Sequence, residues 1–224
     1  DVLRGEAGEA RVDEPQRAVG VVLHLVNGDV AGLDGGARHV DGIVATLGVD
    51  AGDEVLLPDP SYPCNRHFVA AAGGRAVLLP ASAEHRFQLD AAAVTAAWGE
   101  RTRGVLLASP SNPTGTSIDP AELVRIVDVV RSRGGITLID EIYLGLSHDD
   151  QFGQSALALG EDVISINSFS KYFNMTGWRL GWLVVPDALV PVVERLAQNL
   201  FICASTVAQH AALACFEAES IAEY

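Results

Sequence analysis

The sequence predicts an α/β fold built around a mostly parallel β-sheet. Short apolar segments rich in β-branched residues alternate with segments whose apolar positions keep a helical spacing. Strands separated by helices form βαβ units, in which neighbouring strands run parallel. Polar side chains suited to catalysis follow several of the apolar segments at the point where each ends. The pattern therefore indicates one large α/β domain with its chemistry at a single sheet edge.

Composition limits the class of protein. The chain has 224 residues, 49% of them hydrophobic, and a positive mean hydropathy, so a folded globule with a substantial core is expected. Fifteen Lys and Arg stand against 29 Asp and Glu, and the net charge of −14 disfavours nucleic acid and anionic membranes as partners. Neither a membrane-spanning apolar run nor a signal-peptide pattern is present, so we expect a cytoplasmic protein.

The three cysteines support the same compartment. Cys64, Cys203 and Cys215 are an odd number and lack the spacing of metal ligands. Reduced thiols are the simplest interpretation, and no metal site is expected.

The two ends of the chain differ from its centre. Residues 1–34 are predicted to be a lead-in: residues 4–17 are charged and contain Gly and Pro, while residues 19–26 could form a strand. Residues 35–224 are predicted to be the folded domain. An Ala-rich helical pattern reaches Tyr224 without a Gly cap or Pro stop, and the chain begins at Asp1, so we expect it to be part of a longer protein.

The predicted elements of the folded domain alternate along the chain. Strands are expected at residues 54–57, 76–79, 104–108, 136–139, 162–167 and 181–185. Helices are expected at residues 39–47, 65–72, 90–98, 120–131 and from residue 187 onward. The helix at 120–131 has clear start signals, with Asp119 as N-cap, Pro120 at the first helical position and Glu122 three residues after the cap.

A small-residue turn precedes the first of these helices. Gly36, Ala37 and Arg38 follow Gly35 and lead into residues 39–47. Such a turn exposes backbone N–H groups at the positive end of the helix dipole, which is a favourable place for an anion. Taken alone, Gly-Gly before a helix is more often an ordinary turn.

The prediction of function rests mainly on residues 168–181 (SFSKYFNMTGWRLG). Lys171 directly follows the strand at 162–167, with the hydroxyls of Ser168 and Ser170 before it and Arg179 eight positions after it. Hydroxyls and a guanidinium form a phosphate clamp. An amine beside such a clamp indicates a phosphorylated carbonyl cofactor held as a Schiff base.

Other polar residues follow the predicted strands in the same way. Tyr62, Asn112, Asp140, Tyr143 and Lys171 all lie at or just beyond a strand's carboxyl end, and these ends share one edge of a parallel sheet. Each residue has an ordinary alternative: Asp140 could cap a helix, and Asn112 could belong to a simple turn. The shared strand polarity favours the functional interpretation.

Four motifs carry a family resemblance. They are residues 58–63 (PDPSYP), 111–115 (SNPTG), 140–143 (DEIY) and 168–171 (SFSK) with Arg179. From about Gly35 to its end the chain resembles the large domain of the class I/II pyridoxal-phosphate-dependent aminotransferases of fold type I. The resemblance implies a three-layer sandwich with a mostly parallel central sheet. It also implies that the family's C-terminal small domain is absent from this chain.

The resemblance assigns roles to individual residues. Lys171 would hold pyridoxal 5'-phosphate as an aldimine and then, displaced by the substrate amine, move a proton between the substrate's Cα and the cofactor's C4′. Asp140 would keep the pyridine nitrogen protonated. Asn112 and Tyr143 would hydrogen-bond the phenolic oxygen, and Tyr62 would stack on the ring. Lys171, Asp140 and Tyr143 are the catalytic candidates.

The phosphate would be held by a second group of residues. These are Ser168, Ser170 and Arg179 together with the backbone of Gly36, Ala37 and Arg38.

The implied activity is transfer of an amino group from an L-amino acid to a 2-oxo acid, by a homodimer of the full-length protein. Two alternatives share the site: a pyridoxal-phosphate-dependent C–S lyase, and a non-catalytic aminotransferase-like sensor domain of a transcription regulator. In the family the arginine that binds the substrate carboxylate lies in the small domain. We therefore expect the 224-residue chain alone to be a poor catalyst.

Overall fold

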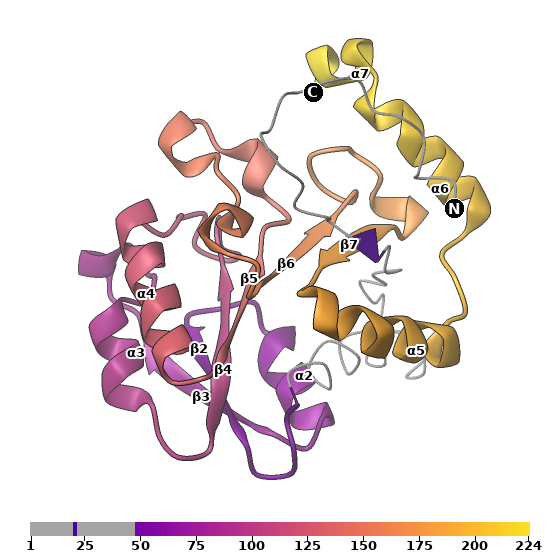
Figure 1. Cartoon of the computed structure of the whole chain (residues 1–224). Coiled ribbons are helices and arrows are strands. Elements are labelled where there is room, and N and C mark those ends of the chain that lie inside the picture. The colour runs from indigo at the N-terminus through magenta and orange to yellow at the C-terminus, as the bar shows by residue number, and fades with distance from the viewer. Residues whose placement is uncertain (1–19, 22–47) are drawn as a thin grey trace.

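A seven-stranded sheet crosses the molecule (Figure 1), in the order β1-β7-β6-β5-β4-β2-β3. The computed structural model describes residues 20–21 and 48–224. The strands are β1 (Gly20–Val21), β2 (Glu54–Asp59), β3 (Arg75–Pro80), β4 (Thr102–Ala108), β5 (Ile136–Asp140), β6 (Val163–Ser168) and β7 (Gly181–Val184). All pairs from β3 to β6 are parallel, while β7 runs antiparallel to both β6 and β1. The mostly parallel sheet is confirmed.

Helices cover both faces of this sheet and complete three layers (Figure 1). One face carries α2 (Cys64–Ala71) and α5 (Val190–Leu200), and the other carries α3 (Ala91–Ala97) and α4 (Pro120–Ser132). Two short helices, α6 (Thr206–Leu213) and α7 (Ala218–Glu223), end the chain. Among the helices of the described residues, none combines the length and apolar character that crossing a membrane requires.

Strand alternation divides the core between the two faces. Val55 and Leu57 of β2 belong to the cluster that contains Val69 of α2, whereas Leu56 between them belongs to the cluster under α3 and α4. All three β2 side chains are completely buried. Successive strand residues point to opposite faces, so an uninterrupted apolar run is what a strand covered on both sides requires.

The start of α4 follows the sequence signals. The Asp119 carboxylate accepts hydrogen bonds from Ala121 N at 2.9 Å and Glu122 N at 3.2 Å, and Pro120 occupies the first turn. These bonds satisfy backbone donors that have no partner within the helix. The predicted N-cap is therefore confirmed.

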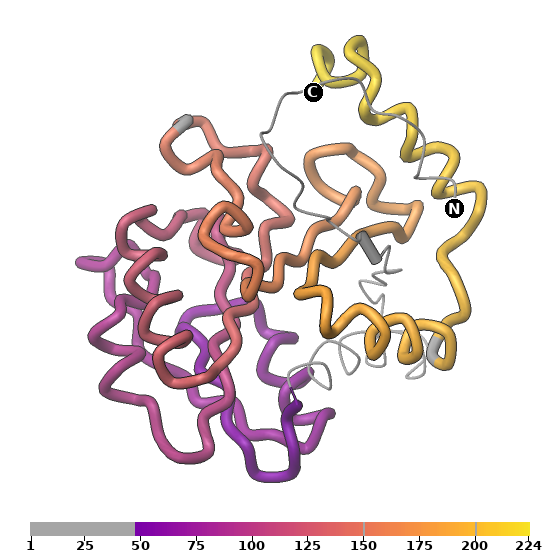
Figure 2. Tube along the Cα trace, viewed as in Figure 1, coloured from indigo at the N-terminus to yellow at the C-terminus, as the bar shows by residue number. Residues whose placement is uncertain are grey.

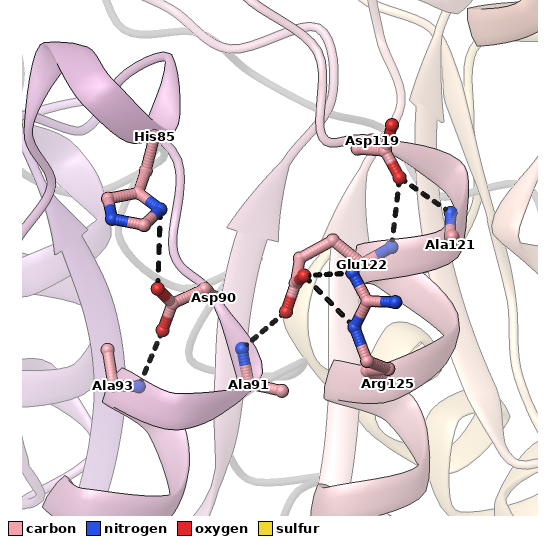
Figure 3. A network of polar contacts seen from close by, with 8 residues as sticks. All are labelled: His85, Asp90, Ala91, Ala93, Asp119, Ala121, Glu122 and Arg125. Carbon is pink, nitrogen blue, oxygen red and sulfur yellow. Dashed lines mark hydrogen bonds and ion pairs between the residues drawn. The ribbon is translucent and has the colours of Figure 1, made fainter.

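Glu122 does not reach back to close a capping box. Its carboxylate instead accepts a hydrogen bond from the backbone N–H of Ala91 at 2.7 Å and pairs with Arg125 one turn along (Figure 3). Ala91 is the first residue of α3, so Glu122 caps a neighbouring helix rather than its own. Tertiary packing of α3 against α4 places this donor within reach, which the spacing along the chain could not indicate.

The Ala-rich end of the chain is broken into separate helices. The helix predicted from residue 187 onward is interrupted between α5 and α6, where Ile202 has a φ of 71°. It is interrupted again at Glu217, whose extended backbone separates α6 and the 3₁₀ turn at Ala214–Phe216 from α7.

In Figure 2 the C-terminal segment (yellow) runs beside the loop between β6 and β7 (light orange). Ala208 and Ala212 of α6 pack with the buried Phe169 of this loop. The break at Glu217 lets Tyr224 approach the aromatic side chains of this loop, which an uninterrupted helix would carry it past.

The order of the strands places a switch point, at which open α/β sheets leave a crevice, between β2 and β4. The chain leaves β2 through α2 toward β3 on one side, then returns to β4 on the opposite side of β2. The connections after β2 and β4 lie on opposite faces, so their loops separate at the carboxyl edge. Ligands of open α/β sheets bind at such a point.

Part of the predicted chain lies outside the described residues. This holds for residues 1–19 and 22–47, which include the predicted helix at 39–47 and most of the predicted strand at 19–26. Gly20 and Val21 of that strand form β1. The proposed boundary between residues 34 and 35 remains a prediction.

We predict that Asp119→Ala lowers the free energy of unfolding by about 1 kcal/mol, because two N–H groups of α4 lose their acceptor. Urea unfolding of both proteins measures this difference. Asp128→Ala is the control: Asp128 pairs with Arg131 on the exposed side of the same helix, and such pairs contribute little. Equal losses in the two variants would contradict the capping role.

Candidate active site

Three strands end together at the edge where the polar residues gather. In the sheet register Ala108 of β4 pairs with Asp140 of β5, and Asp140 pairs with Ile166 of β6. Residues that follow these positions therefore leave the sheet side by side. The loop with Asn112, the turn with Tyr143 and the loop with Lys171 all begin here.

Asp140 stands at the centre of this edge. Desolvation by burial raises the pKa of its carboxyl group to about 6, the hydrogen bond from Ile142 N lowers it, and the charge of Glu141 raises it. That hydrogen bond, 3.0 Å from Ile142 N to Oδ1, shows that the carboxylate also closes the turn after β5. The carboxylate does not cap a helix, because the next element, the 3₁₀ turn at Leu144–Leu146, has Tyr143 at its N-cap position. The raised pKa shows that Asp140 is costly to keep charged.

Tyr143 and Asn112 come together from separate loops. Their side chains form a hydrogen bond, which lowers the pKa of the Tyr143 hydroxyl, while desolvation and the charge of Asp140 raise it to a larger extent. The loop of Asn112 is also a true turn, closed by the hydrogen bond from Gly115 N to Ser111 O at 2.8 Å. The Asn112 amide and the Tyr143 hydroxyl, from the loops after β4 and β5, therefore lie next to each other.

Tyr62 joins this group from the far side of the crevice. A hydrogen bond with the Cys64 thiol, with desolvation and the charges of Cys64, Tyr143 and Asp140, raises the pKa of Tyr62 to about 12. Its hydroxyl therefore stays protonated at neutral pH. Cys64, the first residue of α2, had no role in the sequence prediction and is brought to the site by its place after Tyr62.

Lys171 approaches the same group from β6. Its Nζ lies 5.9 Å from the centroid of the Tyr143 ring, three residues past the end of β6 at Ser168. The next residue, Tyr172, packs against the turn after β5: a Cβ on Gly145 would lie 2.7 Å from the Tyr172 ring. The lack of a side chain at Gly145 thus allows the loop of Lys171 to lie close to the turn of Tyr143.

The hydroxyls beside Lys171 differ in their partners. The Ser168 oxygen is buried, accepts a hydrogen bond from Ser170 N at 3.0 Å, and lies 2.9 Å from Ser170 Oγ and 3.2 Å from Leu180 O. It therefore holds the turn together. Ser170 Oγ lies 3.5 Å from Nη1 of Arg179, which also donates to Thr176 O at 2.7 Å.

Arg179 adopts a backbone conformation that side chains other than Gly rarely take, with φ of 54°. A left-handed residue of this type costs about 1 kcal/mol or more, and such strain gathers at functional sites. Here the backbone turns the guanidinium back toward Ser170 rather than along β7. The sequence spacing alone did not indicate this geometry.

Two buried polar residues support the site, and sequence reasoning gave neither a role. Gln88 Nε2 donates to Thr116 O at 2.7 Å and to Ala108 O at 3.2 Å, which ties both ends of the loop that carries Asn112. Glu141 accepts three hydrogen bonds behind Asp140. Glu141 stands within a quoted motif, whereas Gln88 has no signal in the sequence around it.

A cavity of about 580 Å³ borders Asn112 and Tyr143. It is also lined by Leu146, Ser147, His148, Asp149 and Phe152. The Arg86 guanidinium at its wall lies 4.6 Å from the Phe152 ring centroid. This cavity places open space directly beside the two side chains that meet at the carboxyl edge.

Some predicted site residues cannot be placed. Gly36, Ala37 and Arg38 lie outside the described residues. Within residues 48–224 and β1, no cluster of His, Cys, Asp and Glu could hold a metal ion.

The assembled donors fit pyridoxal phosphate. A phosphate group can be met by the Arg179 guanidinium and the Ser170 hydroxyl, which lie next to one another. A pyridine ring can be met by the carboxylate of Asp140 and by the Asn112–Tyr143 pair. Lys171 supplies an amine 5.9 Å from the centroid of the Tyr143 ring. Each part of the cofactor thus has a side chain of suitable chemical type in the site.

Comparison with protein families gives one clear match. Residues 28–223 match the family model described as aminotransferase class I and II. This span contains every motif quoted above.

Known proteins resemble the chain over most of its length. The valine–pyruvate aminotransferase of Mycobacterium tuberculosis is 41% identical over 175 residues, which are 78% of this chain and 45% of that protein. The aspartate aminotransferase of Sulfurisphaera tokodaii is 32% identical over 190 residues, 81% of this chain and 47% of that protein. A crystal structure of an aminotransferase from M. tuberculosis superposes with a TM-score of 0.79 at 36% identity, covering 91% of this chain and 50% of that one. The chain thus spans about half the length of these relatives.

We predict that Asp140→Asn stabilises the cofactor-free protein, and increasingly so as pH rises. Burial raises the pKa of Asp140 from 3.8 to about 6, so the folded state binds the proton more tightly than the unfolded state. The wild-type protein therefore loses stability as pH rises through this window, a loss that an uncharged amide avoids. Thermal unfolding midpoints between pH 5 and 8 measure the difference, which should grow up to about pH 7. A difference that does not change with pH would contradict the raised pKa.

Proposed function

The chain belongs to the class I and II aminotransferase family, and we propose that the complete protein is a pyridoxal-phosphate-dependent aminotransferase. It would transfer an amino group from an L-amino acid to a 2-oxo acid. The relatives described above are named for different amino donors, valine in one and aspartate in another, so the proposal is limited to the class of substrate.

One observation carries the proposal. An amine, a carboxylate with a raised pKa, and an amide–phenol pair converge from three adjacent parallel strands. The amine belongs to Lys171, which is the only lysine among the 224 residues. Arg179 and Ser170 lie beside it as partners for a phosphate. Structural polar residues have no physical reason to gather in this combination.

Each residue has a defined task in the proposal. Pyridoxal phosphate, when bound, supplies the electron sink that stabilises negative charge at the substrate's Cα. The Asp140 carboxylate would hold a proton on the ring nitrogen, and a positive charge there would lower the pKa that burial raises. The Lys171 amine would hold the cofactor covalently and, once free, would carry the proton removed from the substrate's Cα.

The remaining residues orient and bind. The Asn112 amide and the Tyr143 hydroxyl, already hydrogen-bonded to each other, would hold the ring's phenolic oxygen. Tyr62 would pack on the ring with its hydroxyl protonated. Arg179 and Ser170 would bind the phosphate, with Ser168 fixing the turn on which Ser170 stands. Gly36, Ala37 and Arg38 would add backbone N–H groups to the same phosphate.

We further propose that the complete protein is a cytoplasmic homodimer. The free thiols of Cys64, Cys203 and Cys215 support a reducing compartment. Exposed apolar side chains in the C-terminal helices support burial against further protein; they include Val207, Phe216 and Ile221.

We predict that borohydride reduction of the cofactor-loaded protein leaves a pyridoxyl group on Lys171. Peptide mapping by mass spectrometry locates the adduct. Lys171 is the only lysine in this chain, so Lys171→Ala should remove the covalent adduct from residues 1–224 entirely. Lys171→Ala should also abolish amino transfer while the cofactor still binds without a covalent bond. An unlabelled Lys171 in a protein that nevertheless transfers amino groups would overturn the proposal.

We predict that Asp140→Asn lowers kcat by a factor of about 10² or more while the cofactor remains bound. A neutral amide cannot hold a proton on the ring nitrogen. Asp140→Glu keeps the charge and changes only its position, so its loss should be smaller. Rates of conversion of the cofactor to its amino form, measured with a panel of amino acids, test both variants. Equal losses together with loss of cofactor would point to a structural role alone.

A further inference from the structure

Glu141 is a buried acid beside Asp140 for which the proposed function has no task. Only 3% of the residue is exposed. Its carboxylate accepts hydrogen bonds from Ser165 Oγ at 2.6 Å, Ser155 Oγ at 2.7 Å and Ala156 N at 2.7 Å. Both carboxylate oxygens are therefore engaged, and the side chain points away from the crevice into the protein.

The partners of Glu141 come from separate parts of the fold. Ser165 lies in the middle of β6, and Ser155 and Ala156 begin the 3₁₀ turn that precedes this strand. The backbone N–H of Glu141 also donates to Ile166 O at 2.8 Å. One residue thus binds the end of β5 to β6 through its backbone and through its side chain.

The same residue begins the turn that carries Tyr143. Leu144 N donates to Glu141 O at 2.9 Å, which closes the turn around Tyr143. Asp140 directly precedes this turn and accepts from Ile142 N within it. Any rotation of Glu141 would therefore move the Asp140 carboxylate and the Tyr143 hydroxyl together.

The choice of an acid at this place has a cost. Burying a carboxylate requires hydrogen bonds to replace those of water, and an apolar side chain would avoid that requirement. Glu141 also raises the pKa of the neighbouring Asp140. Directional hydrogen bonds to two hydroxyls and a backbone N–H fix an orientation that apolar contacts would leave looser.

We propose that Glu141 is a positioning residue of the active site. It fixes Asp140 and Tyr143 relative to β6, the strand that leads to Lys171, by means of its bonds to Ser165, Ser155 and Ala156. The inference rests on the proposed function, since it concerns the residues that would hold pyridoxal phosphate. A residue that served stability alone would leave cofactor binding unchanged.

Glu141→Gln in the complete protein tests this role, because the amide keeps the shape but offers a donor where one acceptor stood. Two properties of bound pyridoxal phosphate are measured: its dissociation constant, and the pH midpoint of its visible absorbance change. We expect the dissociation constant to rise about tenfold, as when supporting partners are removed from other sites. The pH midpoint should shift as well, because Asp140 and Tyr143 no longer hold their places.

Glu122→Gln is the matched control. Glu122 also accepts a backbone N–H and joins two elements, α3 and α4 (Figure 3). Its partners, Ala91 and Arg125, are not residues of the site. This variant should lower the thermal unfolding midpoint of the protein and leave both cofactor measurements as in the wild type.

Ser165→Ala provides a milder change for the case in which Glu141→Gln does not fold. It removes one donor to Glu141, together with the acceptor of Asn167 Nδ2, and keeps the carboxylate. The dissociation constant should therefore rise about twofold, and the pH midpoint should shift in the same direction as in Glu141→Gln. If Glu141→Gln or Ser165→Ala lowers the unfolding midpoint as Glu122→Gln does but leaves both cofactor measurements unchanged, the positioning role is overturned. That result leaves the proposed function intact, because the proposed function is tested separately, by the adduct at Lys171 and by amino transfer in the wild-type protein.

Discussion

The parallel, in-register pairing of β4, β5 and β6 is the constraint on which the site depends. Because Ala108, Asp140 and Ile166 lie side by side in the sheet, the three loops that follow must leave from one edge. Residues separated by tens of positions in the chain then meet without any direct signal between them. The loop with Tyr62 lies at the switch point between β2 and β4, since the connections after these strands lie on opposite faces of the sheet.

Gathering polar groups at one buried edge has an electrostatic cost. Burial raises the pKa of Asp140 to about 6. A hydrogen bond with Cys64 and desolvation raise the pKa of Tyr62 to about 12. The buried Glu141 carboxylate accepts three hydrogen bonds, which replace those it would make with water. The apolar layers on both faces of the sheet provide the opposing free energy, at about 25 cal/mol for each Å² of apolar surface removed from water. The apolar residues at the centre of the strands thus stabilise the fold, and this offsets the free-energy cost of the buried polar groups at the strand ends.

The segment between β6 and β7 contains both buried apolar residues that stabilise the fold and polar residues of the site. Phe169 and Leu180 bury their side chains under α6, which anchors the loop at both ends. Between them lie Lys171 and the left-handed Arg179, whose backbone is unfavourable alone and is held by its surroundings. The antiparallel return of β7 along β6 brings Arg179 back to Ser170. A parallel crossover would have carried the guanidinium away from the lysine.

Patterns along the chain are enough to predict the alternation of strands and helices, the cap at Asp119, and the polar residues at strand ends. These features are local: side-chain period, helix capping and strand polarity depend on neighbours along the chain. Long-range packing, in contrast, establishes that Glu122 caps α3, that the Ala-rich end breaks at Glu217, and that buried side chains such as Gln88 support the site. Each of these depends on a donor, acceptor or surface from a distant segment, which becomes a neighbour only after the sheet has formed.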